Sequence, residues 1–189
     1  IAYAGGVYQA RLDSLMVVKQ AIDELNAQGF PSKLLILGKN DPAQLTDWGI
    51  GGPNVSVRFI KDRSEFMGQL RRSDILLSTI AFKSAYPLQD QTCFPTKTFD
   101  YFLAGKPVLA VAPNHTAYGG YMKEHQSAIV VGSLNAEVIA EHIHQLATDM
   151  DQRRQLVDAG FAQLDTHHQR NVQPILQNVL RQDFKGIVA

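Results

Sequence analysis

The 189-residue chain has the size of a single domain, and 45% of its residues are hydrophobic, enough to bury a core. Its 18 basic residues are balanced by 18 acidic ones, which argues against a nucleic-acid-binding or anionic-membrane-binding surface, because both need a basic excess. No apolar run approaches the roughly 20 residues that span a bilayer, no signal sequence opens the chain, and Cys93 has no disulfide partner, so we expect a soluble, cytoplasmic protein.

Short apolar runs alternate with segments of helical period, which predicts a parallel sheet covered by helices on both faces. We expect six strands, at residues 1–4, 33–37, 55–59, 74–79, 108–112 and 128–131. We expect helices around residues 15–25, 43–48, 62–70, 96–104, 136–148 and 152–166, and in an amphipathic segment around 175–180. The sequence therefore predicts one doubly wound, Rossmann-like α/β domain over residues 1–189.

Domains of this class bind ligands beyond the carboxyl ends of their strands. Here these ends are followed by Gly5-Gly6, Gly38-Lys39, Phe59 to Lys61, the loop 80–97 and Pro113-Asn114. The stretch 80–94 is polar and irregular, and it is long for a connection, so we expect a functional loop there. Gly5 and Gly6 suit close backbone approach to a phosphate, although two adjacent glycines equally suit a plain turn.

Lys97 is expected in the first turn of its helix, where exposed N–H groups and the helix dipole already create a positive potential. An anion bound between Lys97 and the amides of Thr96 to Thr98 would relieve this conflict. Asp100 follows three residues later on the same helix face, and its two oxygens suit a pair of vicinal ribose hydroxyls. The alternative is an ordinary solvated ion pair between Lys97 and Asp100.

The run from Pro95 to Val108 reads Pro-Thr-Lys-Thr-Phe-Asp-Tyr-Phe-Leu-Ala-Gly-Lys-Pro-Val. It resembles the donor-site segment of family 4 glycosyltransferases, which commonly reads Pro-x-Lys-x-x-Glu-Tyr-x-x-x-Gly-Lys-Pro-Val. Shorter pieces agree in the same order along nearly the whole chain: Tyr3-Ala-Gly5 with Arg11, Lys33 to Gly38, Ser73 to Leu77, and Arg153-Arg154. The central segment is the specific part of the resemblance.

The resemblance implies the C-terminal, donor-binding half of a two-domain GT-B glycosyltransferase whose N-terminal domain holds the acceptor. It implies that Asp100 binds the ribose of a nucleoside diphosphate sugar, while Lys97, its helix start and Arg11 hold the diphosphate. Phe59 to Lys61 lie where related proteins hold the base. The alternatives are a solvated charge for Arg11 and a plain strand end for Lys61. Transfer is expected to retain configuration and to need no metal or other cofactor.

Two departures from the family pattern concern the sugar. The family often has a second Glu eight positions before the ribose ligand, where this chain has Thr92, and Asp100 is one methylene shorter than the usual Glu. The alternative function is therefore a non-catalytic nucleotide-binding or interaction module with the same fold. No catalytic residue is assigned.

Other classes of site fit the sequence less well. A dehydrogenase-type domain requires Gly-x-Gly-x-x-Gly after the first strand and an acidic residue at the end of the second, and this chain has Gly5-Gly6-Val-Tyr-Gln and Lys39 there. No Gly-x4-Gly-Lys-Ser/Thr motif is present. His142 and His144 point to different faces of one helix, so we expect no metal site.

The chain opens with Ile1 inside a strand-like run, so we expect a longer protein with a domain upstream. Residues 169–189 are expected to form a helix and tail that pack back towards that missing N-terminal domain. Alone, the chain is expected to bind donor and to transfer little, and any peripheral membrane association is expected to involve the missing domain.

Overall fold

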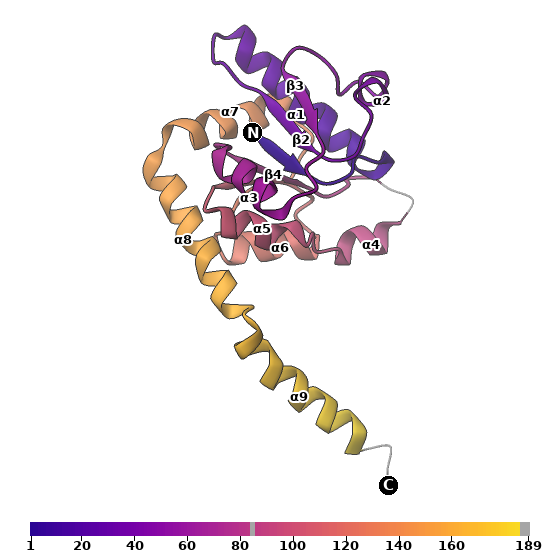
Figure 1. Ribbon diagram of the computed structural model, residues 1–189, viewed down its shortest axis with the longest axis vertical. Helices are drawn as coiled ribbons and strands as arrows, with labels where there is room; N and C mark the ends of the chain where they lie inside the picture. The colour runs from indigo at the N-terminus through magenta and orange to yellow at the C-terminus, as the bar shows by residue number, and fades with distance from the viewer. Residues whose placement is uncertain (84–85, 186–189) are drawn as a thin grey trace.

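The computed structural model describes residues 1–83 and 86–185 of the chain (Figure 1). Its strands are β1 (Ala2–Ala4), β2 (Leu34–Leu37), β3 (Val55–Arg58), β4 (Leu76–Thr79), β5 (Val108–Val111) and β6 (Ile129–Val131). Its helices are α1 (Gln9–Ala27), α2 (Pro42–Asp47), α3 (Arg63–Arg72), α4 (Pro87–Thr92), α5 (Lys97–Ala104), α6 (Ala117–Glu124), α7 (Ala136–Thr148), α8 (Met150–Thr166) and α9 (Gln169–Lys185).

The strands form one parallel sheet in the order β3-β2-β1-β4-β5-β6, which confirms the predicted fold class. Tyr3 of β1 pairs with Ile36 of β2 on one side and with Leu77 of β4 on the other. The strand order therefore reverses at β1, and the connections on its two sides run in opposite directions along the sheet. Sheets of this kind open a crevice at the carboxyl ends of the strands where the order reverses.

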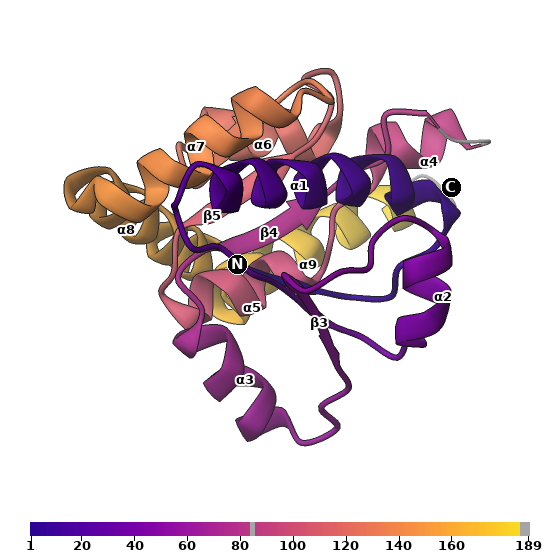
Figure 2. The ribbon, with the colours of Figure 1, turned by 90° about the horizontal axis from the view of Figure 1, so that it is seen from above.

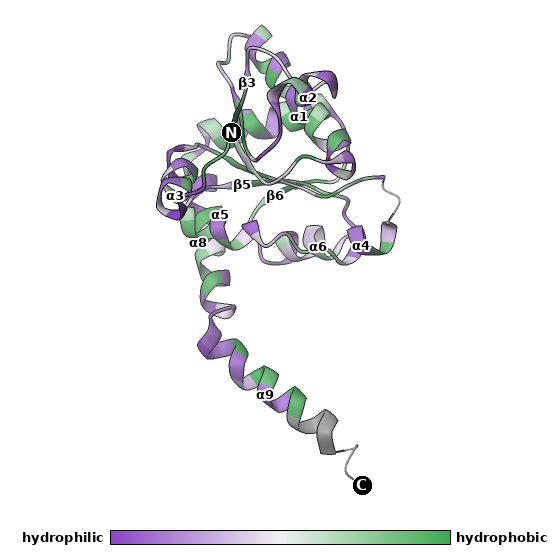
Figure 3. Ribbon diagram, turned by 45° about the vertical axis from the view of Figure 1, so that its right-hand side comes forward, coloured by the Kyte–Doolittle hydropathy of each residue, from purple (hydrophilic) through white to green (hydrophobic). Residues whose placement is uncertain are grey.

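Helices cover both faces of the sheet, as predicted (Figures 2 and 3). One face packs on α1 and α7 through buried side chains that include Leu15, Ile22, Ile139 and Ile143. The other packs on α3, α5 and α6 through side chains that include Leu70, Phe102, Tyr118 and Met122. The consecutive residues Leu76 and Leu77 of β4 are both 0% exposed, as expected for a central strand buried on both faces.

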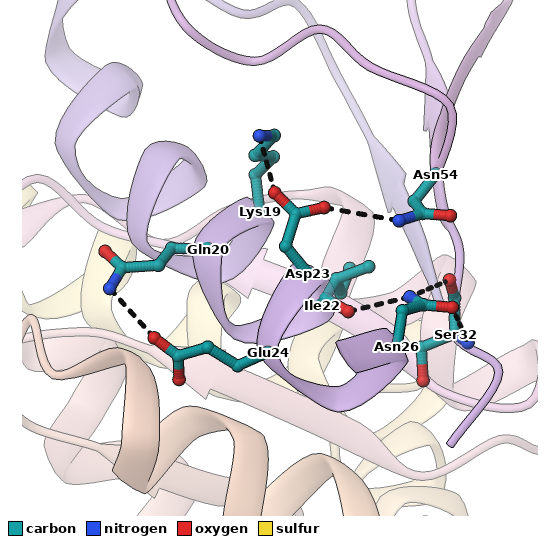
Figure 4. Close-up of polar contacts among 8 residues, drawn as sticks. All are labelled: Lys19, Gln20, Ile22, Asp23, Glu24, Asn26, Ser32 and Asn54. Atoms are coloured by element: carbon teal, nitrogen blue, oxygen red, sulfur yellow. Dashed lines mark hydrogen bonds and ion pairs between the residues drawn. The ribbon is translucent and has the colours of Figure 1, made fainter. Parts of the chain in front are cut away.

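Polar side chains fasten the end of α1 to the loops before β2 and β3 (Figure 4). The Asn26 side chain donates to the Ile22 carbonyl at 2.7 Å and to the Ser32 carbonyl at 2.8 Å. Asn54 donates to Asp23 Oδ1 at 3.3 Å. These bonds lie at the amino ends of the strands, so they fix α1 against the sheet at the end opposite the predicted binding site.

The helix α5 ends as the sequence predicts. Gly105 follows it in the left-handed region, with φ of 65°, a conformation that glycine adopts without steric cost. Tyr101 anchors the middle of α5, because its Oη accepts from the Ala4 amide at 2.8 Å and donates to the Leu77 carbonyl at 2.9 Å. Burial raises the pKa of Tyr101, so its hydroxyl stays protonated and both bonds persist.

Two helices were not expected from the sequence. Residues 80–94 were predicted to be irregular, but 87–92 form α4, while 84–85 lie outside the described residues. The helix α6 contains Gly119-Gly120, which lowers its intrinsic helix propensity. Its start is nevertheless capped, because Thr116 Oγ1 accepts from the Gly119 amide at 3.1 Å. A Cβ on Gly119 would lie 2.7 Å from the Pro113 carbonyl oxygen, so close packing requires glycine there.

The helix α9 extends away from the sheet and its covering helices (Figure 1). Its exposed apolar residues are Val172, Ile175, Leu176, Val179 and Leu180. The final segment is thus helical as far as Lys185, and residues 186–189 lie outside the described part. Its packing against a further domain stays a prediction. Within the described ranges, no helix has the length and apolar character needed to cross a membrane.

Candidate functional site

A cavity of about 380 Å³ opens at the carboxyl ends of β1, β2 and β3, beside the start of α5. It is lined by Gly5, Gly6, Leu37, Gly38, Lys39, Phe59, Ile60, Lys61, Arg63, Phe66 and Lys97. The predicted residues Gly5, Gly6, Lys61 and Lys97 therefore meet in one place. A second hollow, of about 440 Å³, lies between α1 and α7, but Glu24, Glu137 and Glu141 line it and would repel an anion.

Bare backbone forms part of the cavity wall, where the ends of β1 and β2 touch. The Gly5 amide donates to the Leu37 carbonyl at 3.1 Å, and the Gly38 amide donates to the Arg58 carbonyl at 3.0 Å. A Cβ on Gly38 would lie only 2.5 Å from the Gly5 carbonyl oxygen, and Gly5 has φ of 154°. Both positions thus require glycine, and a ligand meets backbone rather than side chains here.

Four cationic side chains line the same cavity: Lys39, Lys61, Arg63 and Lys97. The chain as a whole has a formal net charge of zero, so this concentration of positive charge is local. Aromatic rings lie beneath three of the four cations. Lys39 Nζ is 4.9 Å from the centre of the Phe59 ring, a cation–π contact. Such a cavity favours an anionic ligand.

Asp100 lies beside the cavity and contacts two of its cations. Arg63 Nη2 is 2.6 Å from Asp100 Oδ1, and Lys97 Nζ is 3.3 Å from Asp100 Oδ2. Burial raises the pKa of Asp100, but hydrogen bonds from Arg63 and Lys97 outweigh it, so the pKa lies below its ordinary value. Asp100 is therefore ionised at neutral pH. The predicted ion pair with Lys97 is present, and Arg63 adds a partner that spacing did not predict.

Phe66 of α3 lies beneath this cluster. Its ring centre is 4.8 Å from Lys97 Nζ and 5.8 Å from Arg63 Cζ. The ring thus supports both cations on the same side of the cavity and joins α3 to α5. Sequence reasoning missed Arg63 and Phe66. The available signal was their place just after the third strand, where Asp62 caps α3 by accepting from the Glu65 amide at 2.7 Å.

The start of α5 presents Lys97 as expected and buries Thr98. Lys97 is the first residue of the helix, and Thr96, in the N-cap position, makes no side-chain hydrogen bond to the helix amides. Thr98 is 0% exposed, and its amide already donates to the Pro95 carbonyl at 3.0 Å. Since the first amides of a helix have no acceptor within it, Thr96 and Lys97 provide the predicted anion-binding amides better than Thr98.

Arg11 lies elsewhere. It is 7% exposed, so the alternative of a solvated surface charge is wrong. Its Nη1 donates to the Thr79 carbonyl at 2.5 Å, and its Nε donates to Tyr8 Oη at 3.2 Å. Arg11 thus satisfies a backbone carbonyl where β4 ends, and it is not among the residues that line the cavity. Its proposed contact with a diphosphate would require these bonds to break.

Thr92 is the last residue of α4 and is exposed, with its Oγ1 donating to the Leu88 carbonyl at 2.9 Å. It contributes no carboxylate to the site. Among the described residues, no three His, Cys, Asp or Glu side chains gather in a way that would hold a metal ion.

No protein-family model and no curated protein matches the chain. Solved structures do match. The C-terminal domain of the glycosyl transferase group 1 family protein LpcC from Francisella tularensis has a TM-score of 0.61 and 15% identity, over 88% of this chain and 85% of that one. Sucrose-phosphate synthase from Thermosynechococcus elongatus has a TM-score of 0.68 and 16% identity, over 98% of this chain and 45% of that one.

The N-terminal domain of a trehalose-6-phosphate phosphatase from Candida albicans is also similar, with a TM-score of 0.65 and 12% identity over 95% of this chain and 41% of that one. The chain thus spans less than half of the phosphatase and sucrose-phosphate synthase chains. It has the fold of the C-terminal domain of GT-B glycosyltransferases, as predicted. Because a protein named as a phosphatase has the same fold, the function must be argued from the site.

Proposed function

We propose that the chain binds a nucleoside diphosphate sugar in the 380 Å³ cavity, as the donor half of a retaining, metal-independent glycosyltransferase. The observation that carries this proposal is the combination of a glycine wall with four cations at the carboxyl edge of a parallel sheet. Bare backbone lets a diphosphate approach closely, and the cations neutralise its charge. The cavity also includes Phe59 and Ile60, apolar surface that suits the base.

In this proposal the charged residues divide between the phosphates and the ribose of the donor. Lys97 and the first amides of α5 bind phosphate oxygens, with Arg63 and Lys61 beside them, while Asp100 binds the ribose hydroxyls. When the bond between sugar and diphosphate breaks, negative charge develops on the leaving phosphate. Cations and amides already gathered beside the leaving phosphate stabilise that charge without a metal ion, because opposite charge placed where negative charge develops lowers the barrier.

Titration of the chain with UDP, GDP and their sugars tests donor binding, with calorimetry as the readout. Lys97→Ala should weaken binding of the preferred diphosphate by about 10-fold or more, since a hydrogen bond to a charged group contributes about 1.5–3 kcal/mol. Binding of the corresponding nucleoside should change much less. Lys33→Ala is the matched control, because Lys33 is an exposed lysine just before β2, at the amino ends of the strands. Equal losses in diphosphate and nucleoside affinity would contradict the phosphate role of Lys97.

Asp100→Asn tests the ribose contact. The substitution keeps the size of the side chain and removes the charge, so ribonucleotides should lose more affinity than 2′,3′-dideoxyribonucleotides of the same base. An unchanged ratio between the two ligands would remove Asp100 from the ribose site.

Transfer itself requires an acceptor, and we propose that a further, N-terminal domain of a longer protein supplies it. The alternative is a module that binds nucleotide without transferring sugar. The exposed Thr92, in place of a carboxylate, favours that alternative. Assays of the longer protein with the donor that binds most tightly distinguish the two, because a transferase forms glycosylated product whereas a binding module leaves the donor intact. Full transfer by the isolated chain would contradict the half-enzyme interpretation.

A further inference from the structure

Asp100 is covered by the two cations that also line the proposed phosphate site. Arg63 contacts one of its carboxylate oxygens at 2.6 Å and Lys97 contacts the other at 3.3 Å. The Asp100 side chain is only 13% exposed, whereas those of Arg63 and Lys97 are 60% and 44% exposed. The carboxylate is thus shielded, whereas the two cations that cover it are accessible to a ligand.

From this arrangement we propose that Arg63 makes nucleoside recognition depend on the diphosphate. This inference rests on the proposed function and deepens it. Arg63 pairs with Asp100 until phosphate oxygens, which carry more negative charge than one carboxylate, attract its guanidinium. Its departure uncovers Asp100 Oδ1, which then accepts from a ribose hydroxyl. A nucleoside without phosphates provides no anion to attract Arg63, so it meets a covered carboxylate.

The position of Arg63 supports this role over a purely structural ion pair. The residue is the first of α3, directly after the Asp62 cap, and its side chain reaches α5 from outside that helix. Its guanidinium carbon lies 5.8 Å from the centre of the Phe66 ring, which also lines the cavity, so the guanidinium already lies beside the proposed phosphate site. Because guanidinium and phosphate match in geometry, Arg63 gains bidentate bonds by changing partner.

The test compares diphosphate and nucleoside affinities in Arg63→Gln, using UDP with uridine and GDP with guanosine. We expect the preferred diphosphate to bind about 10-fold more weakly, because a charged hydrogen-bond partner is lost. We expect its nucleoside to bind about 3-fold more tightly, because Asp100 is uncovered and an exposed ion pair of this kind is worth about that factor. A purely structural pair would not strengthen nucleoside binding.

Two further variants complete the test. Lys61 also lines the cavity, but the ion pairs of Asp100 in the described part of the chain are with Arg63 and Lys97. Lys61→Gln should therefore weaken diphosphate binding without strengthening nucleoside binding. In an Asp100→Asn background, Arg63→Gln should no longer improve nucleoside binding, since the carboxylate that it would uncover is gone. Arg63 is largely exposed, so its variants should fold, and circular dichroism checks this.

The outcomes separate this inference from the proposed function. If the unmodified chain binds neither UDP nor GDP, the proposed function fails and this inference fails with it. If a diphosphate binds but Arg63→Gln leaves nucleoside affinity unchanged or lowers it, the proposed function stands and Arg63 bridges Asp100 and phosphate at the same time. That result would overturn the exchange of partners.

Discussion

Replacement of Gly38 by alanine tests whether the contact between the ends of β1 and β2 shapes the cavity. The new Cβ would lie 2.5 Å from the Gly5 carbonyl oxygen, where ordinary van der Waals contacts are 3.4–4 Å. The overlap is with backbone, and both strand ends are held by hydrogen bonds, from the Gly5 amide to Leu37 and from the Gly38 amide to Arg58. One of the two segments must therefore move.

Overpacking of this kind costs about 1–3 kcal/mol, so we expect Gly38→Ala to lower the free energy of unfolding by about 2 kcal/mol. In a domain of this size that corresponds to a fall in Tm of about 4–8 °C. Diphosphate affinity should fall as well, because both segments line the cavity, one with Gly5 and Gly6 and the other with Gly38 and Lys39. Urea unfolding provides the measurement, with the fluorescence of Trp48 as the probe, since this single tryptophan packs against the core.

Gly6→Ala is the matched control, because no heavy atom lies within 4 Å of the Cβ position at Gly6. Its φ also lies outside the left-handed region. The same chemical change should therefore leave stability unchanged or raise it by up to about 1 kcal/mol, through the reduced entropy of the unfolded chain. If Gly38→Ala proves as stable as the unmodified chain, or if Gly6→Ala is destabilised equally, the contact between Gly5 and Gly38 does not have the role inferred for it.

Three other perturbations give definite expectations. Tyr101→Phe should lower the free energy of unfolding by about 2 kcal/mol, because it leaves the buried Ala4 amide and Leu77 carbonyl without a partner; urea unfolding that shows no loss would contradict the two hydrogen bonds. The difference in the free energy of unfolding between the unmodified chain and Asp100→Asn should be constant near neutral pH and should narrow below about pH 4. The folded-state pKa of Asp100 lies below its ordinary value, so the stability that its ion pairs contribute is lost as the pH falls through that pKa. A difference that persists in acid would contradict the ion pairs. Diphosphate affinity should be the same in EDTA and in Mg²⁺, and a strong dependence on Mg²⁺ in calorimetry would contradict the metal-independent site.

The fold was predictable because its signals are local. The strands β1, β2 and β5 appear as continuous apolar runs, and Gly105 marks the end of α5 through a φ that glycine readily adopts. The helix α6 was missed because its signal is not local. Gly119 argues against a helix by propensity, yet it is required by the Pro113 carbonyl that lies against it. Tertiary packing decided this element, and a single sequence does not display that packing.

The site shows the same division. Lys97 and Asp100 are three residues apart on one helix, so their proximity follows from helical geometry. Arg63 contacts Asp100 across 37 positions, and only the packing of α3 beside α5 brings them together. Arg11 differs from both, since its place after the first strand suggested a ligand contact, whereas its Nη1 donates to the Thr79 carbonyl, and its contact with a diphosphate stays a prediction. The role of a charged residue near a strand end therefore depends on its burial and hydrogen-bond partners in the folded chain, which the sequence alone does not give.

The position of the cavity follows from the difference between the two sides of β1, where the strand order reverses. Beyond the short ladder between β1 and β4, Tyr101 bonds to the Ala4 amide and the Leu77 carbonyl, and Arg11 bonds to the Thr79 carbonyl. Side chains of the domain thus satisfy the strand ends on that side. On the other side of β1, Gly5 and Gly38 bring bare backbone together. A ligand at this crevice is therefore directed towards the ends of β2 and β3, into the cavity that the four cations line. The helix α5 contributes to both sides, because Tyr101 bonds to the ends of β1 and β4 and thereby anchors the helix that presents Lys97 and Asp100.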